Sequence, residues 1–90
     1  MKNKKFALIF PCTVKNLAMV WAAFLPGTRI NFGAWIESLE RREILNEENK
    51  PVCEVIMVNC RAENETQYRL AKLNYAKWFY DAERNEFGDN

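Results

Sequence analysis

The sequence contains no histidine, and this absence removes several kinds of chemistry. Histidine is the usual general base at neutral pH and the commonest metal ligand. The spacings of Cys12, Cys53 and Cys60 match no paired zinc-ligand pattern, and a cysteine nucleophile would need a lysine or a carboxylate as its base. The glycines stand alone, so no glycine-rich phosphate loop is formed. We therefore expect a protein that is not an enzyme and that has no catalytic residue, metal site or cofactor.

The sequence also lacks an excess of charge and a long hydrophobic run. Thirteen Lys and Arg residues against twelve Asp and Glu leave a net charge of +1, which creates no large field of one sign. Pro11 breaks the apolar run that begins at Phe6, so this run is shorter than the apolar part of a secretory signal, about 7 to 15 residues. An odd number of cysteines at low density suits a reducing compartment. We expect a cytoplasmic protein that does not enter a membrane.

The length and composition are those of one small globular domain. Ninety residues, of which 49% are hydrophobic and 28% charged, allow a single modest core. We expect a single domain over residues 1–90, with flexible ends at residues 1–4 and 88–90.

The first third of the sequence predicts a strand and then a helix. Phe6 to Phe10 reads as a short buried strand, because Pro11 cannot donate a hydrogen bond to a neighbouring strand. Thr13 is a suitable N-cap for a helix from Val14 to Leu25. Between Asn16 and Pro26 no polar residue marks a solvent-facing side of this helix. The helix is therefore either buried on all sides or covered by a partner or a second copy of the chain.

The middle third predicts a second helix. Pro26, Gly27 and Thr28 form a turn, after which Asn31 could cap a helix that begins at residue 32 or 33 and ends near Ile44. Apolar residues would face inward and charged residues outward, and Glu, Arg and Leu are good helix formers. Ile44 and Leu45 could instead begin a hairpin, but the composition favours a helix.

A polar loop over residues 46–50 separates this helix from a strand. The segment from Val52 to Cys60 is rich in Val and Ile, and its apolar residues occur at both odd and even positions. Both faces of this strand should therefore be covered. Cys53 and Cys60 are seven residues apart, which directs them to opposite faces, so we expect no disulfide between them.

The segment from Ala62 to Phe87, which contains no Gly or Pro, predicts a long C-terminal helix. Asn64 followed by Gln67 resembles a capping box at its start, and Gly88 marks its end. At helical spacing the core face consists of large aromatic residues: Tyr68, Tyr75, Trp78 and Phe79.

The other side of this predicted helix is not simply charged and is our candidate partner-binding site. Tyrosine and arginine are favoured at protein interfaces. The candidate residues are Arg69, Leu73, Lys77, Tyr80 and Arg84. A second interpretation is that Leu73 and Tyr80 contact a neighbouring segment while the basic residues only improve solubility.

Nucleic acid is a less favoured partner than protein. The basic residues of the N-terminus, Lys2, Lys4 and Lys5, could form a groove with those of the last helix if the two groups are adjacent. Glu65, Asp81 and Glu83 lie between the basic residues of this last segment and would repel phosphate.

Together these patterns predict a small α+β single domain with the element order strand-helix-helix-strand-helix. A short sheet would pack against helices that include the long C-terminal helix. An all-helical bundle with one extended crossing segment is the alternative fold. We expect a small binding protein that acts through protein-protein interaction, with a homo-oligomer possible and a nucleic-acid-binding module as the alternative. The composition is typical of phage or mobile-element proteins that block host machinery.

Overall fold

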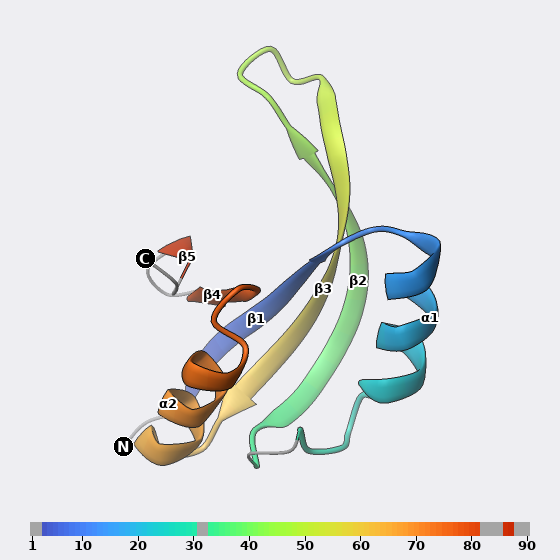
Figure 1. Ribbon diagram of the computed structural model, residues 1–90. Coiled ribbons are helices and arrows are strands. Elements are labelled where there is room, and N and C mark those ends of the chain that lie inside the picture. The colour runs from blue at the N-terminus through green and yellow to red at the C-terminus, as the bar shows by residue number, and fades with distance from the viewer. Residues whose placement is uncertain (1–2, 31–32, 82–85, 88–90) are drawn as a thin grey trace.

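The computed structural model describes residues 3–30, 33–81 and 86–87, in which two helices pack on an antiparallel sheet (Figure 1). The elements in chain order are β1 (Lys4–Pro11), α1 (Val14–Ala23), β2 (Trp35–Leu45), β3 (Pro51–Ala62), α2 (Glu65–Asn74), β4 (Phe79–Asp81) and β5 (Glu86–Phe87). The sheet order is β2-β3-β1-β4-β5. The strand β5 has only two residues and lies at the edge, beside β4.

The strand β1 lies in the middle of the sheet. It pairs antiparallel with β3 on one side and with β4 on the other, and β3 also pairs antiparallel with β2. The strand β3 thus lies between β1 and β2, which α1 connects, and this is the split β-α-β or ferredoxin-like topology. Many unrelated functions share this topology, so it assigns none to this chain.

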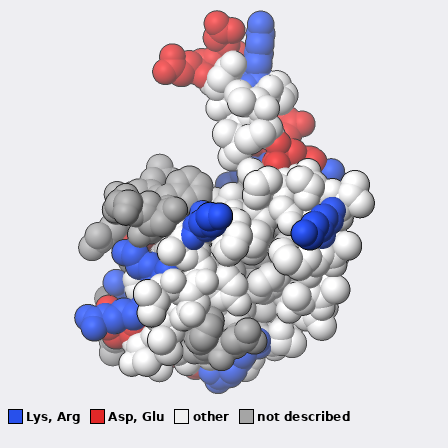
Figure 2. All heavy atoms as spheres, in the orientation of Figure 1, with Lys and Arg blue, Asp and Glu red and all other residues white. Residues whose placement is uncertain are grey.

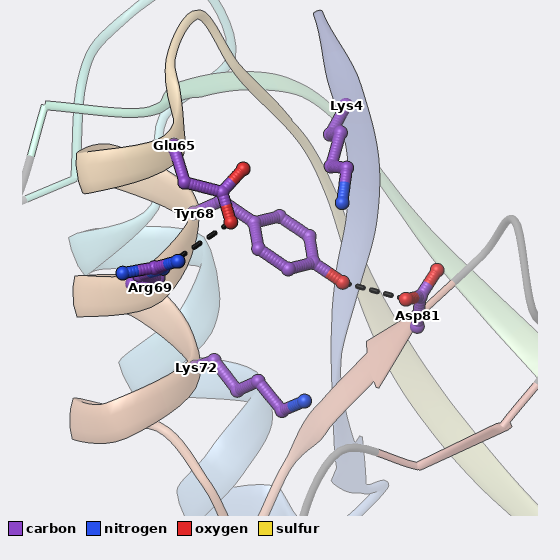
Figure 3. Close-up of a pocket in the computed structure, with 6 residues that line it drawn as sticks. All are labelled: Lys4, Glu65, Tyr68, Arg69, Lys72 and Asp81. Atoms are coloured by element: carbon purple, nitrogen blue, oxygen red, sulfur yellow. Dashed lines mark hydrogen bonds and ion pairs between the residues drawn. The ribbon is translucent and has the colours of Figure 1, made fainter.

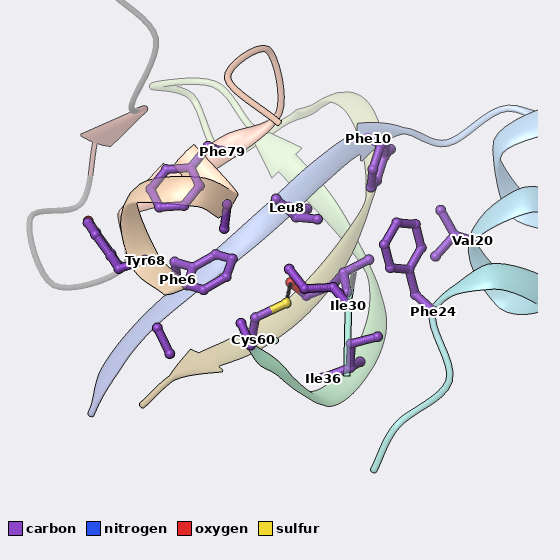
Figure 4. Packing of buried hydrophobic residues seen from close by; sticks show 14 of the residues in the cluster. Phe6, Leu8, Phe10, Val20, Phe24, Ile30, Ile36, Cys60, Tyr68 and Phe79 are labelled. Carbon is purple, nitrogen blue, oxygen red and sulfur yellow. Dashed lines mark hydrogen bonds between the residues drawn. The ribbon is translucent and has the colours of Figure 1, made fainter. Parts of the chain in front are cut away.

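Both helices cover the same face of the sheet. Because side chains alternate along a strand, Phe6, Leu8 and Phe10 of β1 all point to this face. There they pack in one cluster with Val20 of α1 and Tyr68 of α2 (Figure 4). The opposite face carries a smaller buried cluster of Ala7, Val55 and Met57.

The structure confirms both predicted helix starts. The Thr13 hydroxyl oxygen accepts a hydrogen bond from the Asn16 backbone N–H at 3.1 Å. The Asn64 side-chain oxygen accepts one from the Gln67 N–H at 2.9 Å. Each contact satisfies a backbone donor that the first helical turn leaves without a partner.

The predicted helix over residues 32 or 33 to about 44 is wrong, because this segment forms β2. It pairs with β3, and the register shifts between Ile36 and Ser38. This bulge places Ile36 opposite Cys60 and Leu39 opposite Val58, so both contribute to the face that the helices cover. Their spacing of three residues is that of a helix face, and it misled the prediction.

The predicted long C-terminal helix is also wrong. The helix α2 ends at Asn74, Tyr75 is its C-cap, and the chain then returns to the sheet as β4. The Phe79 side chain is fully buried and stacks on Phe6 with 4.9 Å between ring centroids. The observed order is therefore strand-helix-strand-strand-helix-strand, in place of strand-helix-helix-strand-helix. Tyr68 and Phe79 do belong to the core, as predicted, but from a helix and a strand.

The strands β2 and β3 continue beyond the end of β1 as a projecting hairpin (Figure 1). We call residues 41–54 of this hairpin the arm. All side chains from Arg41 to Cys53 are exposed, and the Arg41 guanidinium contacts the Glu54 carboxylate at 2.7 Å where the arm leaves the sheet. At its tip the Asn46 side chain accepts two backbone hydrogen bonds, and Asn49 adopts a positive φ of 62°.

The packing of β4 predicts very different effects for two substitutions in the C-terminal third. Phe79→Ala should lower the free energy of unfolding by about 3 to 5 kcal/mol, because it leaves a cavity beside Phe6 and Tyr68. Leu73→Ala should change it by less than about 0.5 kcal/mol, because Leu73 is 74% exposed. Urea unfolding followed by circular dichroism measures both values, and equal losses would contradict the observed packing.

Candidate functional site

The structure distributes the predicted partner-binding residues over several elements. Arg69 and Leu73 are exposed on α2, whereas Lys77 lies in the turn between α2 and β4. Tyr80 is half-buried on β4 and contacts the cluster on the opposite face of the sheet. Arg84 lies outside the described residues. These residues therefore do not form one helical stripe, and their role in binding stays a prediction.

A small polar hollow lies between α2 and the start of β1, with a volume of about 220 Å³ (Figure 3). It is lined by Lys4, Glu65, Tyr68, Arg69, Lys72 and Asp81. The Tyr68 hydroxyl donates to the Asp81 carboxylate at 2.6 Å, and Arg69 contacts Glu65 at 3.2 Å. The Lys4 ammonium lies 4.5 Å from the centroid of the Tyr68 ring. The hollow thus mixes three basic and two acidic side chains and is no purely basic surface.

A larger and mainly apolar hollow lies between α1 and the turn that follows α2, with a volume of about 520 Å³. We call it the aromatic groove; it is lined by Phe10, Pro11, Lys15, Asn16, Met19, Ala23, Phe24, Tyr75 and Trp78. The ring of Phe10 lies 5.3 Å from that of Trp78 and 5.9 Å from that of Phe24. Phe24 in turn meets Tyr75 edge to face at 6.3 Å. These ring contacts fix the groove's walls, because each ring packs against another.

A second apolar hollow adjoins the aromatic groove. It is lined by Ile9, Pro11, Val55, Lys77 and Trp78, and it shares Pro11 and Trp78 with the groove. Lys15 and Lys77 are the only charged residues among those lining the two hollows in the described part of the chain. Neither lysine makes an ion pair with another described residue.

The outward side of α1 is apolar and exposed, and we call it the α1 face. Its large side chains and their exposed fractions are Val14 at 86%, Met19 at 41%, Trp21 at 44% and Leu25, just beyond the helix, at 52%. Within α1 only Val20 is fully buried, so most of the helix lies outside the core. Figure 2 shows the side of the molecule over α1 as mostly uncharged, whereas charges crowd the arm.

The environments of two cysteines disfavour thiolate chemistry. Burial, with a smaller contribution from the Glu37 charge, raises the pKa of the Cys60 thiol to about 12. Desolvation and a hydrogen bond with Glu54 raise the pKa of Cys12 above its ordinary value. Both thiols therefore stay protonated at neutral pH, and a protonated thiol is neither a good nucleophile nor a metal ligand.

Two further findings apply to the described residues alone. They contain no group of three or more His, Cys, Asp or Glu side chains placed to bind a metal ion together. Neither described helix has the length and apolar character that crossing a membrane would require.

Three hollows and an exposed helix face thus emerge from the described residues, and the sequence indicated only part of them. The sequence showed that this helix lacks a polar side, but it left open whether the helix is buried or available to a partner. The aromatic groove was not, since Phe10, Met19 and Trp78 lie on three segments that are far apart in the sequence. Of the predicted site residues that the structure describes, only Lys77 lines the hollow that adjoins this groove.

The cysteine environments predict selective labelling and a pH effect. Cys53 is exposed on the arm and should react with iodoacetamide in the folded protein, whereas the buried Cys60 should react only on unfolding. The unfolded Cys60 thiol ionises near pH 8.5, while the folded thiol stays protonated up to about pH 12. The neutral Cys60 thiol therefore contributes its full stabilisation of the folded state below about pH 8.5, and this contribution is lost as the pH rises towards 12. Mass spectrometry measures the labelling. Unfolding of wild type and Cys60→Ala at several pH values measures the pH effect, and an equal slope of the unfolding free energy against pH in both proteins would contradict it.

Comparison with known proteins finds no family model, no curated protein and no solved structure that matches this chain. The function is therefore argued from the surfaces described above. The most informative of them are the α1 face, which exposes large apolar side chains, and the aromatic groove, which is a mainly apolar hollow.

Proposed function

We propose that this protein is a non-enzymatic binding protein that docks on the surface of another protein through the α1 face. The observation that carries this proposal is the exposure of Val14, Trp21 and Leu25, which range from 44% to 86% exposed on and beside one short helix. Single exposed apolar residues are ordinary, but contiguous apolar patches on small proteins mark interaction sites.

The chemistry of the α1 face supports a protein partner. Tryptophan is the residue most enriched among the side chains that dominate binding energy at interfaces, and Trp21 is 44% exposed. Met19 is flexible and polarisable, so it adapts to an uneven partner surface. Ala18 and Ala22 are small and exposed, which allows a partner backbone to approach closely. Such a face can bind a partner without any catalytic group. This property would suit an inhibitor that blocks a host protein, and the inhibitor role stays a prediction.

Nucleic-acid binding is the second candidate, and one observation favours it. The fold brings Lys4 of the N-terminus beside Arg69 and Lys72 of α2, which places basic residues from the two groups in one hollow. Glu65 and Asp81 line the same hollow and would repel phosphate.

The opposite face of the sheet also lacks the features of a nucleic-acid platform at its centre. There Ala7 of β1 lies opposite Asn59 of β3, and Ile9 lies opposite Met57. Sheets that bind single strands present aromatic rings at such central positions, on which the bases stack. The protein-binding proposal is therefore preferred.

Photo-cross-linking from the α1 face tests the protein-binding proposal. A benzoylphenylalanine in place of Ala22 should give a discrete adduct with a partner protein in the cells that express the chain. The same residue in place of Thr66, which is exposed on α2, should give none. Mass spectrometry identifies the adduct, and an adduct with a second copy of the chain alone would contradict the proposal.

A pair of charge substitutions localises the contact. Adding Trp21→Glu should abolish the adduct, because a carboxylate cannot be buried in an apolar interface without a partner. Adding Leu73→Glu, at a more exposed apolar residue of α2, should leave it unchanged. Both variants should keep the thermal midpoint within about 4 °C of wild type, because both sites are largely outside the core. Loss of the adduct in the Leu73→Glu variant alone would place the contact on α2.

A gel shift tests the second candidate. If the chain binds protein only, it should form no complex with single-stranded DNA or RNA at low salt. A complex whose affinity falls steeply with salt would contradict this. Its salt slope should then decrease by about one unit in Lys4→Gln or Lys72→Gln if these lysines contact phosphates.

A further inference from the structure

The aromatic groove and the arm have complementary chemistry, although they belong to different parts of the fold. We propose that the arm of one copy of this chain binds in the aromatic groove of a second copy, and that the second copy returns the contact. The groove shares Met19 with the α1 face, but the contact does not depend on the proposed partner protein.

The groove offers an apolar site with a basic rim. The hollow of about 520 Å³ has Phe10 and Phe24, both almost fully buried, on its inner side, and it is large enough for bulky apolar side chains. Lys15 at the groove and Lys77 at the adjoining hollow are exposed, and neither has an ion pair with a described residue. An apolar segment that also carries carboxylates therefore fits this site best.

The arm is a segment of that kind. It exposes Ile44 at 41%, Leu45 at 49% and Val52 at 64%, although these side chains are large and apolar. Next to them in the sequence lie Glu43 and Glu47, which are exposed and make no ion pair with another described residue. Figure 2 shows acidic groups together with basic ones at the end of the arm, and the basic residues of the arm, Arg41, Arg42 and Lys50, are paired with Glu54, Glu40 and Glu48.

The position of the two surfaces allows a reciprocal contact. The groove includes Phe10 and Pro11 at the end of β1, and the arm begins at the same end of the sheet, where Pro11 pairs with Val55. No arm residue lines the groove of its own chain, and the arm projects away from the helices as a continuation of β2 and β3 (Figure 1). Two copies related by a two-fold axis can each place an arm beside the other's groove, so every contact occurs twice.

Reciprocal exchange also explains why the arm can be apolar without being part of a core. An isolated two-stranded hairpin is at best marginally stable in water. Seated in a second copy, the arm removes Ile44, Leu45 and Val52 from water, and the carboxylates of Glu43 and Glu47 meet Lys15 and Lys77. The two lysines determine the orientation of the arm in the groove, because the opposite orientation would move the carboxylates of the arm away from them.

Charge exchange between two variants tests this arrangement. One variant carries Lys15→Glu and Lys77→Glu, and the other carries Glu43→Lys and Glu47→Lys. Size-exclusion chromatography with light scattering should show a dimer for wild type, with each variant about tenfold weaker in self-association. An equimolar mixture of the two variants should form a heterodimer again, because each groove then meets an arm of opposite charge. Lys72→Glu reverses one positive charge outside the groove and should leave the dimer unchanged.

Several outcomes would overturn the proposal. A wild-type protein that stays monomeric up to millimolar concentration would exclude it, as would a dimer that resists both pairs of substitutions. If Trp21→Glu separates the dimer while the groove and arm variants leave it intact, the copies meet through the α1 face. That result would also contradict the proposed function, whereas a monomer that still gives the cross-linked adduct of Ala22 would leave the proposed function intact. Circular dichroism confirms that each variant is folded.

Discussion

The packing of Phe79 against Phe6 and Tyr68 determines the arrangement of the rest of the chain. The three rings come from β4, β1 and α2, and their centroids lie 4.9 to 6.0 Å apart. This contact brings the chain back to the sheet directly after α2 and gives β1 a second neighbouring strand. It also positions the turn before β4, where the Trp78 carbonyl accepts a hydrogen bond from the Ile9 N–H at 2.8 Å and the Trp78 ring packs on Phe10. One side of the aromatic groove is thus a direct result of core packing.

The two helices differ in how much of their surface the core uses. The helix α2 buries Tyr68 and Ala71, and its exposed side is mostly polar. The helix α1 buries only Val20 completely and leaves apolar side chains in water. A domain of this size has too few residues to cover both sides of a second helix. The surface that stays open is therefore the place where additional protein can be accommodated, and it adjoins the groove along Met19 and Ala23.

The helix starts and the central strands can be predicted from the sequence, because Thr13, Asn64 and Pro11 act through local geometry. Prediction from the sequence fails where apolar residues of a strand have the spacing that is typical of a helix. Ile36 and Leu39 are three residues apart but reach one face of a strand through a bulge. Likewise, Phe79 continues the helical spacing of Tyr68 although the helix has ended, and no Gly or Pro signals the change.

The candidate site shows the same limit. The α1 face consists of residues that are neighbours in the sequence, so its apolar character could be predicted, whereas its exposure could not. The aromatic groove requires the positions of β1, α1 and the turn before β4 relative to one another, and local patterns carry no information about them. Lys77 was selected as a binding residue for its place on a helix that the structure does not contain, yet it lies at the rim of a real hollow.

The arm has a consequence for the order of events in folding and binding. Its strands are continuations of β2 and β3, but beyond Val55 no third strand pairs with them among the described residues. Their base is reinforced by the ion pair of Arg41 with Glu54 and by a hydrogen bond from the Cys12 N–H to the Glu54 carbonyl at 3.0 Å. The arm can therefore open and close while the sheet stays intact, with a free energy of opening well below that of the whole domain. Slow hydrogen exchange of its backbone amides would then indicate that a neighbouring molecule protects them, since the fold alone does not.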